Sequence, residues 1–141
     1  MNPVNFIFKN KHKGLTLRAY LYSAWYRFQI RFADTKRLYK KWGKEGAESD
    51  YEETKEHYCY AANVAFVVDH VCTKTAWESK CLVRALTAQR LLARKKIHST
   101  LYLGCAVQEG EMVAHAWLRC GSMYVTGGNG RDYAKVDQFY M

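Results

Sequence analysis

A cysteine and a histidine in this chain occupy settings that suit acyl-transfer chemistry. Cys81 opens a strongly helical segment, and His115 opens a strand-like segment further along the chain. The N-terminus of a helix carries partial positive charge, which favours the thiolate form of a cysteine placed there. A histidine can take the proton of the thiol and later return it to a leaving group. No other pair in the sequence combines a nucleophile and a base in this way.

The remaining cysteines and histidines fit simpler roles. Free cysteine is most often a small buried hydrophobic residue, which we expect of Cys59, Cys72, Cys105 and Cys120. The other histidines stand among charged or loop-like neighbours and are expected at the surface; they are His12, His57, His70 and His98. Alone, His115 on its apolar strand would be interpreted as a core histidine. Because Cys81 lies upstream, the catalytic interpretation of His115 is given the same weight as the core interpretation.

Composition indicates one domain of 141 residues with a net charge of +9. Residues 1–45 hold 11 Lys and Arg but only two acidic residues, so the rest of the chain is balanced, with 11 basic (22 − 11) and 11 acidic (13 − 2). This predicts a basic aromatic helical arm over 1–46 and a catalytic core over 47–141. The odd cysteine count, with no signal peptide or transmembrane span, favours the cytoplasm. No metal or nucleotide motif is present, so no cofactor is predicted.

Periodicity predicts helices in the first two thirds of the chain and strands in the last third. Three helices are expected: a basic one from Leu15 to Trp42, one capped by Ser49-Asp50 and continuing through Ala61–Val71, and one from about Ser79 to Lys96. Residues 43–46 form the expected linker. Three strands are expected over 100–107, 112–120 and 123–126, the last two joined by a two-residue turn at Gly121-Ser122. This order predicts an α+β domain with an antiparallel meander.

Four blocks of this sequence resemble the lasso-peptide biosynthesis B proteins, which are transglutaminase-like (papain-like) cysteine peptidases. The blocks are Trp77–Leu86 with its Cys-Leu-x-Arg-Ala-Leu core, Gln89–Leu92, Leu101–Gly104 and Ala114-His115-Ala116-Trp117. The resemblance covers roughly residues 58–140. It implies a leader peptidase with a Cys-His-Asp triad, whose first two members are Cys81 and His115.

The acid of that triad has no direct counterpart here. In the family it follows the histidine by eleven or twelve residues, where this chain has Thr126 and Gly127. The turn at Gly121-Ser122 pairs His115 with Gly128, which makes Asn129 the first candidate to orient the imidazole. Thr126 is the second candidate and Asp132 the third. A Cys-His dyad oriented by a main-chain group is a further alternative.

The resemblance implies a mechanism and a set of partners. The Cys81 thiolate attacks the scissile carbonyl, while the Cys81 N–H and the Trp77 indole hold the oxyanion and Arg84 adds positive charge. The partners are the lasso precursor peptide, a separate leader-recognition protein and an ATP-dependent lasso cyclase. Because the acid is displaced, a non-catalytic protein of the same fold, which binds the precursor and bridges it to the cyclase, is the alternative.

The basic arm allows three interpretations. Leu17, Leu21, Trp25, Phe28 and Phe32 recur at helical spacing, and this stripe is expected to pack on the core. Docking to the partner protein comes next, and contact with an anionic membrane surface after it. Nucleic acid ranks last, because no nucleic-acid motif is present.

Overall fold

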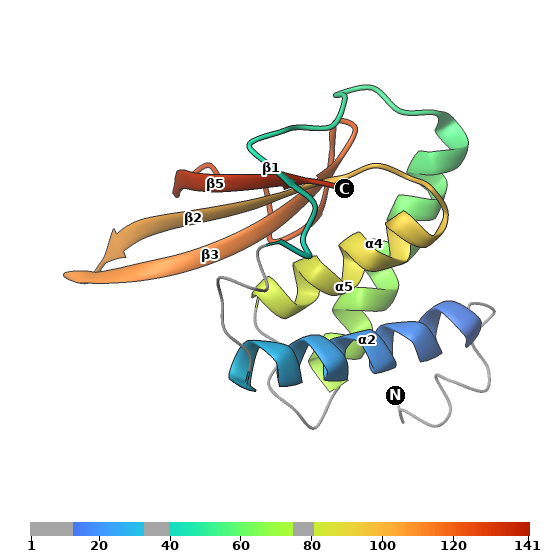
Figure 1. Ribbon diagram of the computed structural model, residues 1–141, viewed down its shortest axis with the longest axis horizontal. Helices are drawn as coiled ribbons and strands as arrows, with labels where there is room; N and C mark the ends of the chain where they lie inside the picture. The colour runs from blue at the N-terminus through green and yellow to red at the C-terminus, as the bar shows by residue number, and fades with distance from the viewer. Residues whose placement is uncertain (1–12, 33–39, 75–80) are drawn as a thin grey trace.

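The computed structural model describes residues 13–32, 40–74 and 81–141, and it confirms the α+β architecture. The described helices are α2 (Lys13–Phe32), α4 (Lys55–Lys74) and α5 (Cys81–Arg94). The described strands are β1 (Lys44–Glu45), β2 (Thr100–Gln108), β3 (Glu111–Cys120), β4 (Met123–Thr126) and β5 (Ala134–Tyr140). Helices α4 and α5 pack on the sheet, and α2 packs on those two helices from the side away from it (Figure 1).

Two of the expected helix boundaries are wrong. Trp42 lies in a turn after α2, and its buried indole meets the ring of Phe139 edge-on at 5.5 Å; residues 33–39 of the expected helix lie outside the described residues. Helix α4 begins at Lys55, where the hydroxyl of Thr54 accepts a hydrogen bond from the His57 N–H at 3.1 Å. Ser49, the expected cap, is instead buried and hydrogen-bonds the Thr100 hydroxyl at 2.7 Å.

The sheet is more than the expected meander. Strands β2, β3 and β4 follow one another antiparallel as predicted, and the turn pairs Cys120 with Met123. Strand β5, which the sequence analysis missed, returns to pair with β2, giving the order β1-β5-β2-β3-β4. Residues Lys44–Glu45 of the expected linker form β1 and pair with the end of β5. Residues on both sides of position 46 therefore belong to one sheet.

A β-bulge changes the register between β3 and β4. Arg119 pairs with Tyr124, but the next pair joins Leu118 to Thr126, so Val125 is the extra residue. Strand β4 ends at Thr126. The predicted pairing of His115 with Gly128 is therefore wrong, and β3 continues alone past the end of β4 on that side in the described part of the chain.

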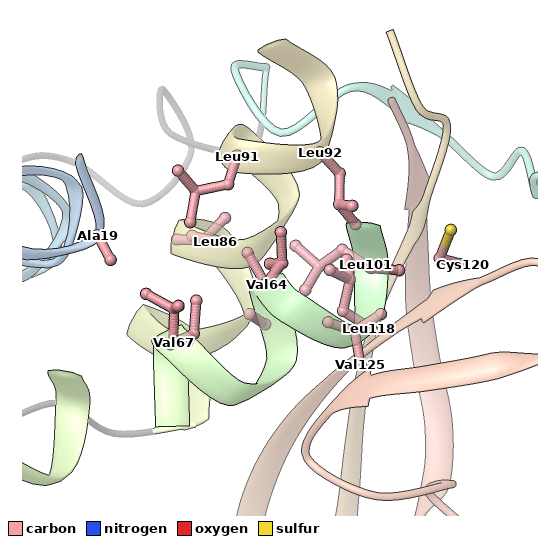
Figure 2. Packing of buried hydrophobic residues seen from close by; sticks show 14 of the residues in the cluster. Ala19, Val64, Val67, Leu86, Leu91, Leu92, Leu101, Leu118, Cys120 and Val125 are labelled. Carbon is pink, nitrogen blue, oxygen red and sulfur yellow. The ribbon is translucent and has the colours of Figure 1, made fainter. Parts of the chain in front are cut away.

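The core lies between the two inner helices and the sheet (Figure 2). Valines of α4, among them Val64 and Val67, meet leucines of α5 such as Leu86, and the sheet adds Leu101 and Leu118. All are almost fully buried. At about 1.5–3 kcal/mol for each buried aliphatic side chain, this cluster is the main force that holds α5 against β3.

The stripe that periodicity assigns to the core is exposed. Helix α2 instead packs through Leu15, Ala19 and its tyrosines, and those residues join the core cluster. The opposite face carries the stripe: Leu17, Leu21, Trp25, Phe28 and Phe32 are all exposed. The prediction that the stripe packs on the core is wrong, because α2 is apolar on two sides and only one of them meets α4 and α5.

Arg119 is fully buried on the face of the sheet turned away from the helices. Its guanidinium carbon lies 3.7 Å from the centre of the Tyr51 ring. Its N–H groups donate at 2.7–3.0 Å to the main-chain carbonyls of Ser49, Asp50 and Gly121 and to the hydroxyl of Tyr102. One side chain thus fastens the segment that precedes α4 onto β2 and β3.

Glu48 completes this polar cluster from its exposed rim. Its carboxylate accepts hydrogen bonds from the hydroxyls of Tyr102 at 2.7 Å and Tyr51 at 3.0 Å, and Lys135 and Arg119 lie 3.6 and 3.3 Å away. The Tyr102 hydrogen bond, followed by the Tyr51 hydrogen bond and the two positive charges, holds the pKa of Glu48 below its ordinary value. Burial raises the pKa of Tyr102, so its hydroxyl remains a donor.

This lowered pKa predicts a loss of stability in acid. A carboxylate whose folded-state pKa is depressed stabilises the protein above its unfolded pKa of about 4.3, and the contribution disappears as pH falls through the folded-state value. The difference in unfolding free energy between wild type and Glu48→Gln should therefore shrink as pH is lowered, measured by urea denaturation. Glu52→Gln, at an exposed position, is the control. A difference that stays constant with pH would contradict the assignment.

Candidate active site

Cys81 is the first residue of α5 and is half-buried. The first four N–H groups of a helix have no partner within it, so donors at this end are available to an anion. The side chain of Cys81 packs against the edge of the hydrophobic core, which fixes its position relative to the sheet. Trp77 and the expected cap Ser79 lie outside the described residues.

A cavity of about 830 Å³ opens beside Cys81. Its walls come from the C-terminal half of α2, the start of α5 and the strands β2, β3 and β5, together with Trp42. Aliphatic side chains dominate the lining: Ile30, Leu82, Val83, Leu103, Met112, Val113 and Val136. Arg27 is the one charged side chain among the described residues that line it. A thiol beside an apolar cavity of this size can be reached by several residues of a peptide.

His115 also borders the cavity, and its ring is held in one orientation. Nε2 lies 2.7 Å from the carbonyl oxygen of Gly127. A carbonyl only accepts hydrogen bonds, so Nε2 carries the proton and Nδ1 is left as the basic nitrogen. The ring of Tyr133 stacks on the imidazole at 4.4 Å, and that of Trp117 stacks at 5.9 Å.

The thiol and the imidazole lie on different faces of β3. Side chains alternate along a strand, so His115 shares a face with Trp117, whereas Ala116 and Leu118 point the other way. Ala116 and Leu118 belong to the core under α4 and α5, and Cys81 packs against that core. No hydrogen bond joins Cys81 to His115 in the part of the chain that the structure describes. The structure thus brings both residues to one cavity without forming the pair.

A family model, described as the transglutaminase-like superfamily, matches residues 24–138. The chain belongs to the transglutaminase-like superfamily. No curated protein and no solved structure matches it significantly. The match covers the C-terminal part of α2, all of α4 and α5, the cavity and all of β2 to β4, so Cys81 and His115 both lie within the transglutaminase-like domain. Membership shows the domain type and is compatible with thiol chemistry.

In this transglutaminase-like domain a main-chain oxygen stands where the resemblance implies an acid. Gly127 is one of the two positions where the family acid would fall, and its carbonyl holds His115. It has φ +75°, and a Cβ there would lie 2.4 Å from the carbonyl oxygen of Ala116. Gly130, with φ +68°, approaches the ring of Trp117 just as closely. This loop has no room for a carboxylate side chain at 127, and only glycine reconciles its backbone with its neighbours.

The three side chains predicted as orienters make no contact with His115 among the described interactions. Asn129 is exposed, and its Oδ1 accepts from the Arg131 N–H at 3.0 Å, as in an Asx turn. The Thr126 hydroxyl is buried with no hydrogen-bond partner within the described residues. Asp132 is exposed in the turn before β5. The catalytic role of each stays a prediction.

Arg84 lies one turn after Cys81 and is engaged elsewhere. Its guanidinium donates to the carboxylate of Asp69 on α4 at 2.9 Å. It therefore ties α5 to α4, and its predicted electrostatic support of Cys81 stays a prediction. Within the described ranges, no group of three His, Cys, Asp or Glu is placed to hold a metal ion.

Two residues of the site escaped the sequence analysis. Tyr133 covers the imidazole. Its sequence signal is an aromatic residue in a glycine-rich turn, and this signal is weak on its own. Cys105 lines the cavity and is half-buried, although it was expected in the core. Cys59, also expected in the core, is exposed on α4, whereas Cys72 and Cys120 are buried as predicted.

The five thiols should differ in their reaction with iodoacetamide. Cys81, at a helix N-terminus, should be alkylated first, ahead of the more exposed Cys59. Cys120 should be slow, because burial raises its pKa to about 11 and the nearby Glu53 charge acts in the same direction. Peptide mapping of the partially alkylated native protein measures the order. Faster alkylation of Cys59 would show that the helix end does not activate Cys81.

Proposed function

We propose that this protein is a cysteine peptidase that removes the leader from a ribosomally made lasso-peptide precursor. The observation that carries the proposal is the placement of Cys81: the first residue of a helix, half-buried, beside an apolar cavity in a transglutaminase-like domain. The resemblance of the Cys81 and His115 blocks to lasso B proteins supplies the substrate.

The proposed reaction is acyl transfer through a thioester. His115 takes the proton of the Cys81 thiol, the resulting thiolate adds to the scissile carbonyl carbon, and main-chain N–H groups in the first turn of α5 hold the oxyanion. The C–N bond then breaks, and the departing amine takes a proton from the His115 imidazolium. Water, deprotonated by His115, hydrolyses the thioester and releases the second peptide. In the described conformation the Gly127 carbonyl keeps the proton on Nε2 and leaves Nδ1 as the basic nitrogen.

The open edge of β3 offers a route for the precursor. Between Glu111 and Trp117, β3 pairs with β2 on one side, and no described strand pairs with it on the other. An extended peptide could add to this edge through main-chain hydrogen bonds. Alternate side chains of that peptide would then enter the apolar cavity, which selects aliphatic or aromatic residues near the cleavage site.

Catalysis requires the imidazole to leave the face on which Gly127 and Tyr133 hold it. Catalytic hydrogen bonds often tighten only in the complex with substrate, and precursor or partner binding along β3 is the proposed trigger for this movement.

The placement of the thiol and the imidazole on different faces of β3 also favours a second function. A protein whose histidine stays on the Trp117 face would bind the precursor and pass it to the cyclase without cleaving it.

Mass spectrometry of a candidate precursor separates these functions. The precursor is incubated with the protein alone and together with a candidate leader-recognition protein. Leader release in either condition establishes a peptidase, and release only in the second shows that the partner completes the site. Precursor binding without cleavage in both conditions would overturn the peptidase and support the binding function.

A further inference from the structure

The exposed face of α2 is an apolar surface that the core leaves uncovered. Five large side chains occupy one stripe, and Trp25, Phe28 and Phe32 are 54, 56 and 69 % exposed. Their rings contact one another, with centroids 6.1 Å apart for Trp25 and Phe28 and 5.0 Å apart for Phe28 and Phe32. From Leu17 to Phe32 the stripe runs about 22 Å along the helix. A continuous apolar surface of this kind marks an interaction site.

Basic side chains border the stripe on both sides. At 3.6 residues per turn, Arg18 falls on one flank and Arg31 and Arg27 on the other. Arg18 and Arg31 are exposed, and the Arg31 guanidinium lies 5.9 Å from the centre of the Phe32 ring. Helix α2 contains no acidic residue, and the chain as a whole carries a net charge of +9. The surface is therefore apolar along its centre and positive along its edges.

We propose that α2 is a membrane-docking helix that lies flat on an anionic phospholipid bilayer. Leucine, tryptophan and phenylalanine side chains would enter the boundary between headgroups and acyl chains, while the flanking arginines remain at the level of the phosphates. The opposite side of α2 is fixed to α4 and α5, so the whole domain is carried to the surface. None of the described helices is long and apolar enough to cross a bilayer, so the contact is peripheral.

The arginines beside the stripe favour a lipid surface over an apolar protein groove as its partner. A hydrophobic partner groove binds the stripe, and charged residues at the exposed rim of such an interface add little affinity. An anionic bilayer uses both parts: each basic residue near the surface contributes attraction to the headgroups, and each buried side chain contributes transfer free energy. Exposed tryptophan and phenylalanine next to arginine match that double requirement.

The test is co-sedimentation of the full-length protein with vesicles of equal parts phosphatidylglycerol and phosphatidylcholine, beside vesicles of phosphatidylcholine alone. We expect binding to the anionic vesicles only. It should weaken at high salt, where the screening length falls from about 10 Å at 0.1 M to about 3 Å at 1 M. The double variant Trp25→Ser with Phe28→Ser should bind at least about tenfold more weakly. Phe66→Ser, which removes an aromatic side chain on α4 that is 59 % exposed, should bind as wild type does.

Three results would overturn the proposal: no binding of wild type to anionic vesicles, equal binding by the Trp25/Phe28 variant, or equal loss in Phe66→Ser. A concentration-dependent dimer that the Trp25/Phe28 substitutions dissociate, without vesicle binding, would instead assign the stripe to contact between copies. Circular dichroism confirms that the exposed substitutions leave the fold intact. Cys81→Ala should bind vesicles normally, so this test and that of the peptidase fail independently.

Discussion

Replacing Cys81 with alanine is expected to lower the rate of leader release by at least about a thousandfold, because no other group can form the thioester. The substitution removes one half-buried sulfur atom from the first turn of α5 and leaves the cavity walls in place. Precursor binding should therefore persist, and the unfolding free energy should change little. The measurement is the initial rate of leader release by mass spectrometry, with binding followed by fluorescence anisotropy of a labelled precursor.

Cys105→Ala is the matched control. Cys105 lines the same cavity and is also half-buried, but it lies within β2 rather than at a helix end. We expect its replacement to leave the rate within about threefold of wild type, since a thiol within a strand lacks the main-chain N–H groups of a helix end that would hold the oxyanion. A Cys81→Ala protein that still cleaves, or a Cys105→Ala protein that does not, would reject Cys81 as the nucleophile.

The sequence singled out Cys81 and His115, which the structure places at one cavity, but not their relation in space. A helix-opening cysteine and a strand histidine are local features, and the order of blocks around them indicates the transglutaminase-like family, which the match over residues 24–138 confirms. The face of β3 that carries His115 is set by which residues of that strand pack under α5. The group that holds the imidazole is the carbonyl of Gly127, in line with the main-chain alternative, but side-chain types could not identify which carbonyl it is.

The fold was predicted where contacts are local and missed where they are not. The turn at Gly121-Ser122 fixes the start of β4, and both strand ends were placed correctly there. The bulge at Val125 then shifts the register by one, which no composition signal announces. Strand β5 pairs with β2, which lies far from it in the sequence. Much of β5 is exposed, so its alternation of apolar and polar residues is weak.

The stripe on α2 shows the limit of hydrophobic periodicity. A regular spacing of Leu17, Leu21 and Trp25 predicts an apolar face, yet it does not say what that face meets. Helix α2 has a second apolar side formed by Leu15, Ala19 and tyrosines, and that side packs on the core. The small residues Thr16, Ala19 and Ser23 are fully buried on the packed side of α2, and they allow α4 and α5 to approach closely.

Arg119 is expected to have the largest effect on stability of any single side chain on the sheet. It is fully buried, and its removal would leave the carbonyls of Ser49 and Gly121 without their donors. Arg119→Met keeps an unbranched side chain in place of the aliphatic stem but none of the hydrogen bonds of the guanidinium. We expect it to lower the unfolding free energy by about 3–5 kcal/mol, because buried polar groups that lose an ionic partner are costly. Urea denaturation followed by circular dichroism measures the change.

Two further variants separate the buried guanidinium from its exposed surroundings. Lys135→Met removes the half-exposed cation 3.6 Å from Glu48, and we expect a change within about 0.5 kcal/mol, as for most surface ion pairs. Tyr102→Phe removes only the hydroxyl that accepts from Arg119 Nε at 2.9 Å, which should cost about 1–3 kcal/mol. It tests the cluster even if Arg119→Met does not fold. A Tyr102→Phe protein as stable as wild type would mean that the fastening of residues 48–51 to the sheet rests on packing against the Tyr51 ring rather than on these hydrogen bonds.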